Sequence, residues 1–397
     1  MVARTIDIAH SFTGEAGASK TKVGILQLSA AFVIGFICIY VKTFASITSL
    51  ISFPDAVDKE LLFAGVALLS LHIASKSKSY GKRLIPLLLV LLSTLYTYFV
   101  SGETAPLSVS LIIIAAATAG DSKSLMRLWF ATTAFLSLFV IAVYGLTAIF
   151  DPGSVSYILR WESGVETAVR FTFFFSHPNM VAALVMMMCG AYMYLNYDSI
   201  GFRTYVLILA VAATVLLFTD SKTSTALIVL SVVCFACQKQ WRVFERSRLR
   251  ELVGILPIIF FFIVYLLAGP LYSDSLGQAL TGRVSLWHYC LENQGVTLFG
   301  QLFVPTKSIG ANGWTFYYTT LDCAYASGLL VLGLCFSAFF CSCVYRRVKK
   351  NDSQLASELP LILVMLLFGF TEVHVFSIVI CAPLLLLSGG ILPPEHS

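Results

Sequence analysis

Residues 359–387 read LPLILVMLLFGFTEVHVFSIVICAPLLLL, two apolar runs separated by a short segment that contains Glu372 and His374. Apolar runs of this kind are typical of membrane-spanning helices, which need roughly 20 apolar residues each. A carboxylate and an imidazole between two such runs are energetically costly unless they are paired or take part in chemistry. The stretch therefore predicts two neighbouring membrane helices joined by a hinge at Glu372 and His374, both of them candidate acid–base groups.

Similar apolar runs recur along the whole 397-residue chain. Apolar residues make up 58% of it, charged residues only 12%, and the mean hydropathy is +0.86. A soluble fold cannot hide so much apolar surface, so a soluble enzyme, a disordered chain and a nucleic-acid binder are excluded. We expect an all-α, polytopic transmembrane helical bundle that forms a single integral membrane domain over residues 1–397. Its candidate spans, about twelve at the usual length, are 23–41, 61–74, 84–100, 106–119, 125–150, 180–196, 205–219, 223–238, 252–269, 321–344, 359–370 and 373–387.

The basic residues predict how this bundle is oriented. With the N-terminus inside, 19 of the 26 Lys and Arg residues fall in cytoplasmic segments, as the positive-inside rule requires. We therefore expect a multi-pass protein of a bacterial cytoplasmic (inner) membrane with both termini cytoplasmic. Residues 1–22 form a polar cytoplasmic tail in this interpretation. Residues 151–179 and 270–320 form two long outer loops.

Reactive side chains gather at the predicted outer ends of spans that are far apart in sequence. The alternative interpretation is ordinary solvated loop charge, but several of these residues are flanked by strongly apolar segments, where an unpaired charge is costly. The pattern therefore predicts one site that opens to the outside. Its candidates are Arg170, His177, Asn179, Lys222, Arg283, Trp287, Asp322, Glu372 and His374.

Local patterns suggest a role for some of these residues. Pro178 favours a helix start, with Ser176 and Asn179 as caps, so an anion could bind at that helix N-terminus. Lys222 lies in a short polar turn and could contribute a phosphate-binding charge. Arg283 and Trp287 share one helix face at i,i+4, which would place a guanidinium beside a ring able to stack on a sugar.

No known metal or nucleotide motif is present in the sequence. It lacks HExxH, a Walker loop and an Asp-x-Asp pair in an outer loop, so we expect no metal and no cofactor. Most of the ten cysteines lie in apolar runs, where cysteine packs as a small hydrophobe. Cys290 and Cys323 alone lie near the second long outer loop.

The order of these motifs resembles the bacterial O-antigen polymerase and ligase superfamily, and Wzy-type polysaccharide polymerases more than ligases. The resemblance covers about residues 165–390. One departure is Lys222, where the family often has arginine, whose planar fork binds phosphate in a bidentate way. The matching pieces are Arg170 with His177-Pro178-Asn179, the turn 219–224, Thr281-Gly282-Arg283 with Trp287 and Gly300, Asp322 with Tyr325 and Gly328, and Glu372.

The resemblance implies a fold like that of the GT-C membrane glycosyltransferases. It implies a repeat-unit polymerase acting on oligosaccharides carried by undecaprenyl diphosphate, to build a surface polysaccharide (O-antigen, capsule or exopolysaccharide). Other implied partners are the lipid bilayer and a flippase and chain-length regulator of the same pathway, and no nucleic acid is implied. The diphosphate would be bound by Arg170, Arg283, Lys222, His177 and Asn179, and the acceptor hydroxyl activated by Glu372, His374 or Asp322.

Two other functions remain open at this stage. An O-antigen ligase would use the same donor and transfer the glycan to lipid A core. A transporter of polysaccharide or lipid-linked oligosaccharide would need a polar path through the bundle, and few of the predicted spans carry an ionisable residue near mid-depth.

Overall fold

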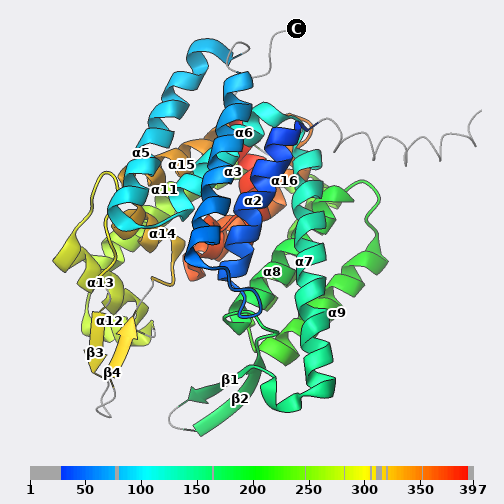
Figure 1. Cartoon of the computed structure of the whole chain (residues 1–397), viewed down its shortest axis with the longest axis vertical. Helices are drawn as coiled ribbons and strands as arrows, with labels where there is room; N and C mark the ends of the chain where they lie inside the picture. Colours follow the sequence, from blue (N-terminus) through cyan, green and yellow to red (C-terminus); the bar gives the residue numbers. More distant parts are fainter. Residues whose placement is uncertain are drawn as a thin grey trace, which may run out of the picture.

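The computed structural model describes residues 28–76, 80–162, 165–245, 247–280, 282–304, 306–309, 315–318, 321–350 and 352–391. The predicted cytoplasmic tail, 1–22, lies outside this part of the chain. This described part of the chain is 77% helical with almost no sheet, as the sequence predicted (Figure 1). The α-helices are α2 (Ala30–Ser46), α3 (Asp55–Ser75), α5 (Ile85–Ser101), α6 (Ala105–Ala119), α7 (Ser122–Phe150), α8 (Pro178–Leu195), α9 (Phe202–Thr219), α10 (Lys222–Trp241), α11 (Ser247–Ala268), α12 (Asp274–Ala279), α13 (Arg283–Gln294), α14 (Ala324–Ser327), α15 (Leu334–Lys349) and α16 (Leu355–Thr371).

Within the described residues, five helices are long and apolar enough to cross a membrane, namely α7, α8, α9, α10 and α11. Four shorter apolar helices accompany them: α2, α5, α6 and α16. Most of α8 is buried, whereas less than a third of α7, α9 and α11 is buried, as expected for helices that face lipid. The chain is thus a helical membrane protein, and the total of twelve crossings stays a prediction.

Hydrogen bonds between helix termini show which termini lie together at each end of the bundle. At one end the turn after α2 contacts the segment before α8, with Ser49 N donating to Phe174 O at 2.7 Å. At the other end Lys239 donates to Ile200 O at 2.6 Å, and Gln354 donates to Asp121 at 2.9 Å. The first contact marks the predicted outer end of the bundle, and the other two contacts mark the predicted inner end. Which end faces the cytoplasm stays a prediction.

Both predicted outer loops contain short antiparallel hairpins, which the sequence analysis did not anticipate. The first pairs β1 (Tyr157–Glu162) with β2 (Val165–Phe171), after a 3₁₀ turn, η2 (Pro152–Ser154). The second pairs β3 (Thr306–Ile309) with β4 (Thr315–Tyr318). Both hairpins lie at the lower end of the molecule in Figure 1. The two hairpins therefore lie at the same end of the bundle, and that this end is the outer one stays a prediction.

The predicted span 321–344 is not one continuous helix. It consists of α14, a π-helical turn η4 (Gly328–Leu332) and α15, with the break at Gly333. The loop after α13 enters this break: Gln301 N donates to Val331 O at 2.9 Å, and Leu334 N donates to Thr297 O at 3.0 Å. The loop thus supplies hydrogen bonds to a backbone that a regular helix would have paired internally.

Glycine permits the close approach of these two backbones. Gly300 has φ +83°, and a Cβ there would lie 2.5 Å from Val331 O. Gly333 has φ +91°, and a Cβ there would collide with the backbone nitrogen of Gly300. At each of these two glycines, therefore, the backbone has a positive φ and also lies in close contact with another backbone segment.

We expect Gly300→Ala to lower the free energy of unfolding by about 1–3 kcal/mol, the usual cost of a strained φ for a residue with a Cβ. The close contact of the new Cβ with Val331 O should add to this cost. Thermal unfolding of the purified protein measures the change. Gly145→Ala in α7 is the matched control, because no atom lies within 4 Å of its Cβ position. Equal melting temperatures for the two variants would contradict this account of Gly300.

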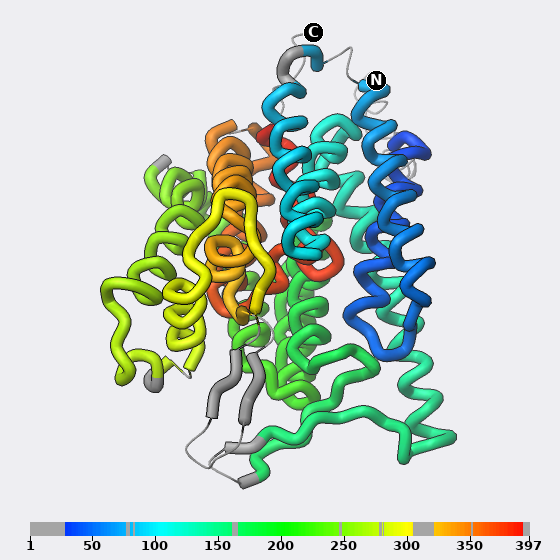
Figure 2. Tube along the Cα trace, turned by 60° about the vertical axis from the view of Figure 1, so that its left-hand side comes forward, coloured from blue at the N-terminus to red at the C-terminus, as the bar shows by residue number. Residues whose placement is uncertain are grey.

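The last predicted span, 373–387, is also not a regular helix. It forms two 3₁₀ segments, η5 (Val373–Phe376) and η6 (Ala382–Gly390), joined by an irregular stretch. This C-terminal segment (residues 373–391) runs through the middle of the bundle, red in Figure 2 between the orange, cyan and green helices. The apolar side chains of residues 378–382 and 384–387 are all at most 1% exposed.

Hydrogen bonds from other helices help to stabilise this irregular backbone. The indole of Trp129 donates to Ile378 O at 2.7 Å, and Tyr40 donates to Val379 O at 3.5 Å. Non-helical backbone is tolerated at membrane depth only where protein surrounds it. Pro383, which lacks an N–H, also disfavours a continuous helix here.

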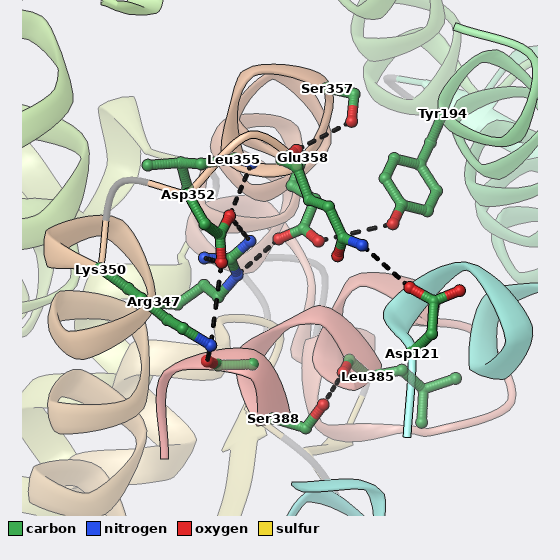
Figure 3. A network of polar contacts seen from close by, with 12 residues as sticks. Asp121, Tyr194, Arg347, Lys350, Asp352, Leu355, Ser357, Glu358, Leu385 and Ser388 are labelled. Atoms are coloured by element: carbon green, nitrogen blue, oxygen red, sulfur yellow. Dashed lines mark hydrogen bonds and ion pairs between the residues drawn. The ribbon is translucent and has the colours of Figure 1, made fainter. Parts of the chain in front are cut away.

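A buried ion-pair network lies at the predicted inner end (Figure 3). Arg347 of α15 donates to Glu358 of α16 at 2.6 Å, and their side chains are 1% and 0% exposed. Arg347 also contacts Asp352 at 2.9 Å, and Tyr194 of α8 donates to Glu358 at 3.4 Å. The network thus joins α8, α15 and α16. The remaining short turns are η1 (Gly81–Leu84) and η3 (Val243–Glu245).

Candidate functional site

A chain of hydrogen bonds joins Arg170 to Glu372 at the predicted outer end. The guanidinium of Arg170 donates to the side-chain oxygen of Asn179 at 2.5 Å, and the Asn179 amide donates to Glu372 at 3.2 Å. The three residues come from β2, the first turn of α8 and the end of α16. Residues more than 190 positions apart in sequence therefore meet in one cluster.

The first turn of α8 differs from its prediction in one respect. The helix begins at Pro178, as predicted, but the capping group is His177, whose ring accepts from Asn179 N at 3.1 Å. Ser176 instead donates to Ile47 O at 3.1 Å. The Asn179 side chain is therefore free to bridge Arg170 and Glu372.

Arg170 is held from a second direction. Its Nε donates to Thr219 O at 2.7 Å, at the C-terminal end of α9, where the carbonyl end of the helix dipole favours a cation. Beside it Arg160 of β1 contacts Asp220 at 2.5 Å. The hairpin thus places two guanidiniums at the α9–α10 turn. Arg160 is not among the predicted site residues, because the pairing of β1 with β2 that brings it near Arg170 cannot be read from the sequence.

Arg283 approaches the same cluster from the other long loop. It is the first residue of α13 and follows Gly282, which has φ +78°. Arg283 donates to Thr371 O at 3.2 Å and lies 3.5 Å from Asp322. Its side chain is 40% exposed, so it can reach a ligand. Thr371 directly precedes Glu372, and the charges of both Arg283 and Arg170 act on the Glu372 carboxyl group.

The environment of Glu372 raises the pKa of its carboxyl group to about 7, mainly through burial. The positive charge of Arg283 opposes the increase, the negative charge of Asp322 adds to it, and the Asn179 hydrogen bond and Arg170 lower the pKa again. A carboxyl group with a pKa near 7 can both accept and release a proton at neutral pH.

Two histidines lie beside this carboxyl group. Burial and the nearby charge of Arg170 lower the pKa of His177, while Asp322 opposes the change. His177 is therefore neutral at pH 7 and keeps the lone pair that caps α8. His374 lies in η5, two residues after Glu372, and lines a cavity together with Val373 and residues of the α5–α6 turn.

Two of the predicted site residues, Lys222 and Trp287, are not placed as the sequence predicted. Lys222 is the first residue of α10 and is exposed, and the cation bound to Asp220 in that turn is Arg160. Trp287 is only 4% exposed, so its ring offers no open face to a sugar in this structure. Its Nε1 has no hydrogen-bond partner among the described residues.

The described residues contain no group of three His, Cys, Asp or Glu side chains able to hold a metal ion. Cys290 and Cys323 are both buried and free, and burial raises the pKa of the Cys290 thiol to about 11.

Comparisons of the chain with protein-family models, curated proteins and solved structures give no match. The class of this protein is therefore defined by its fold and its site alone. The chain is a helical membrane protein with a cluster of two arginines and a protonatable carboxyl group at one end of its bundle.

Proposed function

We propose that this chain is a membrane glycosyltransferase that polymerises undecaprenyl-diphosphate-linked oligosaccharide repeat units on the outer face of a bacterial cytoplasmic membrane. The supporting observation is that Arg170, through Asn179, and Arg283, through Thr371, both come close to the Glu372 carboxyl group. This pattern supplies fixed cations and a proton acceptor in one place. A fold of twelve spans related to the GT-C enzymes belongs to the same proposal.

The chemistry requires these two kinds of group. The acceptor hydroxyl oxygen forms a bond to the anomeric carbon of the donor sugar, and the bond from that carbon to the diphosphate oxygen breaks. The bonding electrons leave with the polyprenyl diphosphate, whose growing negative charge is stabilised by the guanidiniums of Arg170 and Arg283. The acceptor proton passes to the Glu372 carboxylate.

Other members of the cluster position these groups. Asn179 fixes the distance between Arg170 and Glu372 through its two hydrogen bonds. Asp322 lies close to Arg283, and its negative charge helps to keep the pKa of Glu372 near neutral. We therefore assign Asp322 to orienting Arg283, and rank Glu372 before His374 as the base.

The packing of the bundle core argues against a transporter, which would need a polar path through the bundle. The outer cluster lies at one end of the bundle and the buried Arg347–Glu358 ion pair at the other. The apolar C-terminal segment, with Ile378 and Leu387 at most 1% exposed, fills the core. A ligase would use the same donor chemistry, and the acceptor distinguishes it from a polymerase.

The proposal is tested with purified protein and lipid-linked repeat unit as the only substrate. We expect a ladder of longer lipid-linked glycans, with and without a chelator of divalent cations. Transfer to lipid A core without any ladder would identify a ligase. Absence of both products from folded protein would refute glycosyl transfer by this chain.

The pH dependence of the same reaction reports on Glu372. A base must be ionised, and with a pKa of about 7 the ionised fraction rises from about a tenth at pH 6 to about nine tenths at pH 8. We expect the rate to fall roughly tenfold from pH 8 to pH 6. An ordinary glutamate would be fully ionised over this range. A flat profile, or a Glu372→Gln variant with the wild-type rate and profile, would exclude Glu372 as the base.

A further inference from the structure

An open groove lies between α5 and α15, which pack side by side in Figure 1. Its volume is about 390 Å³, within the range of about 300–1,000 Å³ that is usual for ligand sites. On α15 it is lined by Cys335, Phe339, Cys343 and Arg346, which follow one another at three- to four-residue spacing and so share one helix face. The groove therefore runs along the axis of α15.

One end of the groove lies at the predicted inner end of the bundle. Arg346 lines it there, next to Arg347 of the buried ion-pair network. Ile391 of the C-terminal segment also lines the groove, and its neighbour Gly390 lies against the backbone of Arg346 and Arg347. The groove is thus bounded by α5, α15 and the end of the C-terminal segment.

The groove faces the surrounding bilayer. Leu89 of α5 lines it and is 63% exposed, and Leu92, one turn further along the same helix, is 62% exposed. Ala338 of α15 is also exposed within the groove. An exposed apolar surface of this kind is typical of contact with a membrane. Arg346 is the single charged side chain in the described wall.

The length of the groove matches one leaflet of a membrane. From Cys335 to Arg346, α15 rises about 16 Å at 1.5 Å per residue. The hydrocarbon core of a bilayer is about 30 Å thick, so one leaflet accounts for about 15 Å of it. A second transmembrane helix would need a seam along the whole thickness. The length therefore favours a lipid acyl chain, with its headgroup at the level of Arg346.

The charge at the end of the groove is unpaired. Four basic residues lie at the C-terminal end of α15, and three of them have partners. Arg347 belongs to the buried network, Lys349 lies 5.7 Å from the centre of an aromatic ring, and Lys350 donates to the C-terminal segment at 2.8 Å. The guanidinium of Arg346 has no hydrogen-bond or ion-pair partner within the described residues. A free guanidinium is suited to a phosphate, which it can bind with two parallel hydrogen bonds.

A second lipid-facing groove shows that this combination is specific. It lies between α7, α8 and α9, has a volume of about 340 Å³ and is lined by apolar side chains such as Leu138, Met188 and Leu207. Its described wall contains no charged residue. That groove can accept an acyl chain but offers nothing to a headgroup, whereas the groove between α5 and α15 offers both kinds of contact.

We propose that the groove between α5 and α15 binds one anionic phospholipid of the leaflet at the Arg346 end. The phosphate contacts the Arg346 guanidinium, and an acyl chain lies along the groove. Basic pockets between membrane helices bind acidic headgroups in this way. The bound lipid joins α5 to α15 and to Ile391, and it therefore stabilises the packing of the C-terminal segment. This site lies at the opposite end of the bundle from Glu372 and does not depend on the proposed glycosyl transfer.

The experiment compares two lipids that differ only in headgroup charge. Delipidated full-length protein in a neutral detergent is titrated with phosphatidylglycerol or with phosphatidylcholine of the same acyl chains, and native mass spectrometry gives the dissociation constant of the first bound lipid. We expect phosphatidylglycerol to bind about tenfold more tightly, and to raise the melting temperature because it binds the folded state. Arg346→Ala should abolish this preference, since a charge-assisted contact is lost. Arg346→Lys keeps the charge but loses the planar fork, so it should retain part of the preference.

Two further variants separate the groove from general attraction to basic residues. Arg248 of α11 is an exposed arginine at the same predicted end that does not line the groove, so Arg248→Ala should keep the wild-type preference. Ala338→Trp places a large ring in the open groove without changing the charge. We expect this variant to fold normally, because Ala338 is exposed, and to lose tight binding of phosphatidylglycerol.

The outcomes decide the proposal. Equal affinities for the two lipids, or an unchanged preference in folded Arg346→Ala, would refute the site. An equal loss in Arg248→Ala would show only general attraction to a basic surface, and undiminished binding to Ala338→Trp would place the lipid outside the groove. Tighter binding of undecaprenyl phosphate than of phosphatidylglycerol would overturn the assignment to a phospholipid. Each of these results leaves the glycan ladder, and with it the proposed function, unaffected.

Discussion

Replacing Arg170 or Arg283 by alanine is expected to lower the rate of chain extension on the order of a hundredfold or more. Each guanidinium would contribute a charge-assisted contact that strengthens as the diphosphate leaves, and losing one such contact costs about 2–4 kcal/mol in the transition state. Arg→Lys keeps the charge but loses the planar fork, so it should restore only part of the rate. The measurement is the rate of glycan elongation at matched amounts of folded protein.

The control is Lys59→Ala in α3. Lys59 is an exposed basic residue of the same predicted outer side, so its removal changes the net charge equally without touching the cluster. We expect its rate to stay close to wild type. Near-normal polymer from both arginine variants would refute the diphosphate assignment. Arg283→Ala should also move the pH profile to higher pH, because Arg283 lowers the pKa of Glu372.

Glu358→Ala is expected to destabilise the protein by about 3–5 kcal/mol, because it leaves the buried Arg347 guanidinium without its closest partner. Both side chains are at most 1% exposed, so water cannot replace the lost carboxylate. The double variant Arg347→Met with Glu358→Leu removes both charges and should recover most of the loss. Thermal unfolding in detergent measures all three proteins.

An exposed ion pair of the same protein provides the comparison. Arg242 and Glu245 lie 3.8 Å apart with side chains 77% and 48% exposed, and exposed pairs contribute about 0–1 kcal/mol. Glu245→Ala should therefore leave the melting temperature almost unchanged. A Glu358→Ala variant as stable as Glu245→Ala would show that the Arg347–Glu358 pair does not support the bundle.

Hydropathy predicted most helices, because lipid imposes a simple demand on the sequence. The run 125–150 became α7 and the run 205–219 lies within α9, each with boundaries a few residues away from those expected. The same reasoning failed for 321–344 and 373–387. Those runs are equally apolar, but they are surrounded by protein, which can satisfy a broken backbone where lipid cannot.

The sequence predicted that several of these polar residues cluster, but it did not predict the role of Arg160 or the position of Trp287. Apolar flanks around His177 and Glu372 indicated functional polar groups, and the structure places Arg170, Asn179, Arg283, Asp322 and Glu372 in one cluster. Pairing across the hairpin could not be read from the chain, so Arg160 was overlooked. The position of Trp287 depended on which side of α13 is buried, and an i,i+4 spacing alone does not decide that.

The irregular C-terminal segment has a consequence for how the protein is assembled during synthesis. A regular helix can enter the bilayer alone because it pairs its own backbone groups, but residues 373–391 cannot, since their irregular stretch needs Trp129 and Tyr40 as donors. This segment therefore enters its final position only when α2, α6, α7 and α15 are already in place. Its docking also positions the hinge at Glu372 and His374. The outer cluster of Arg170, Asn179 and Glu372 is thus complete only after these helices have been inserted.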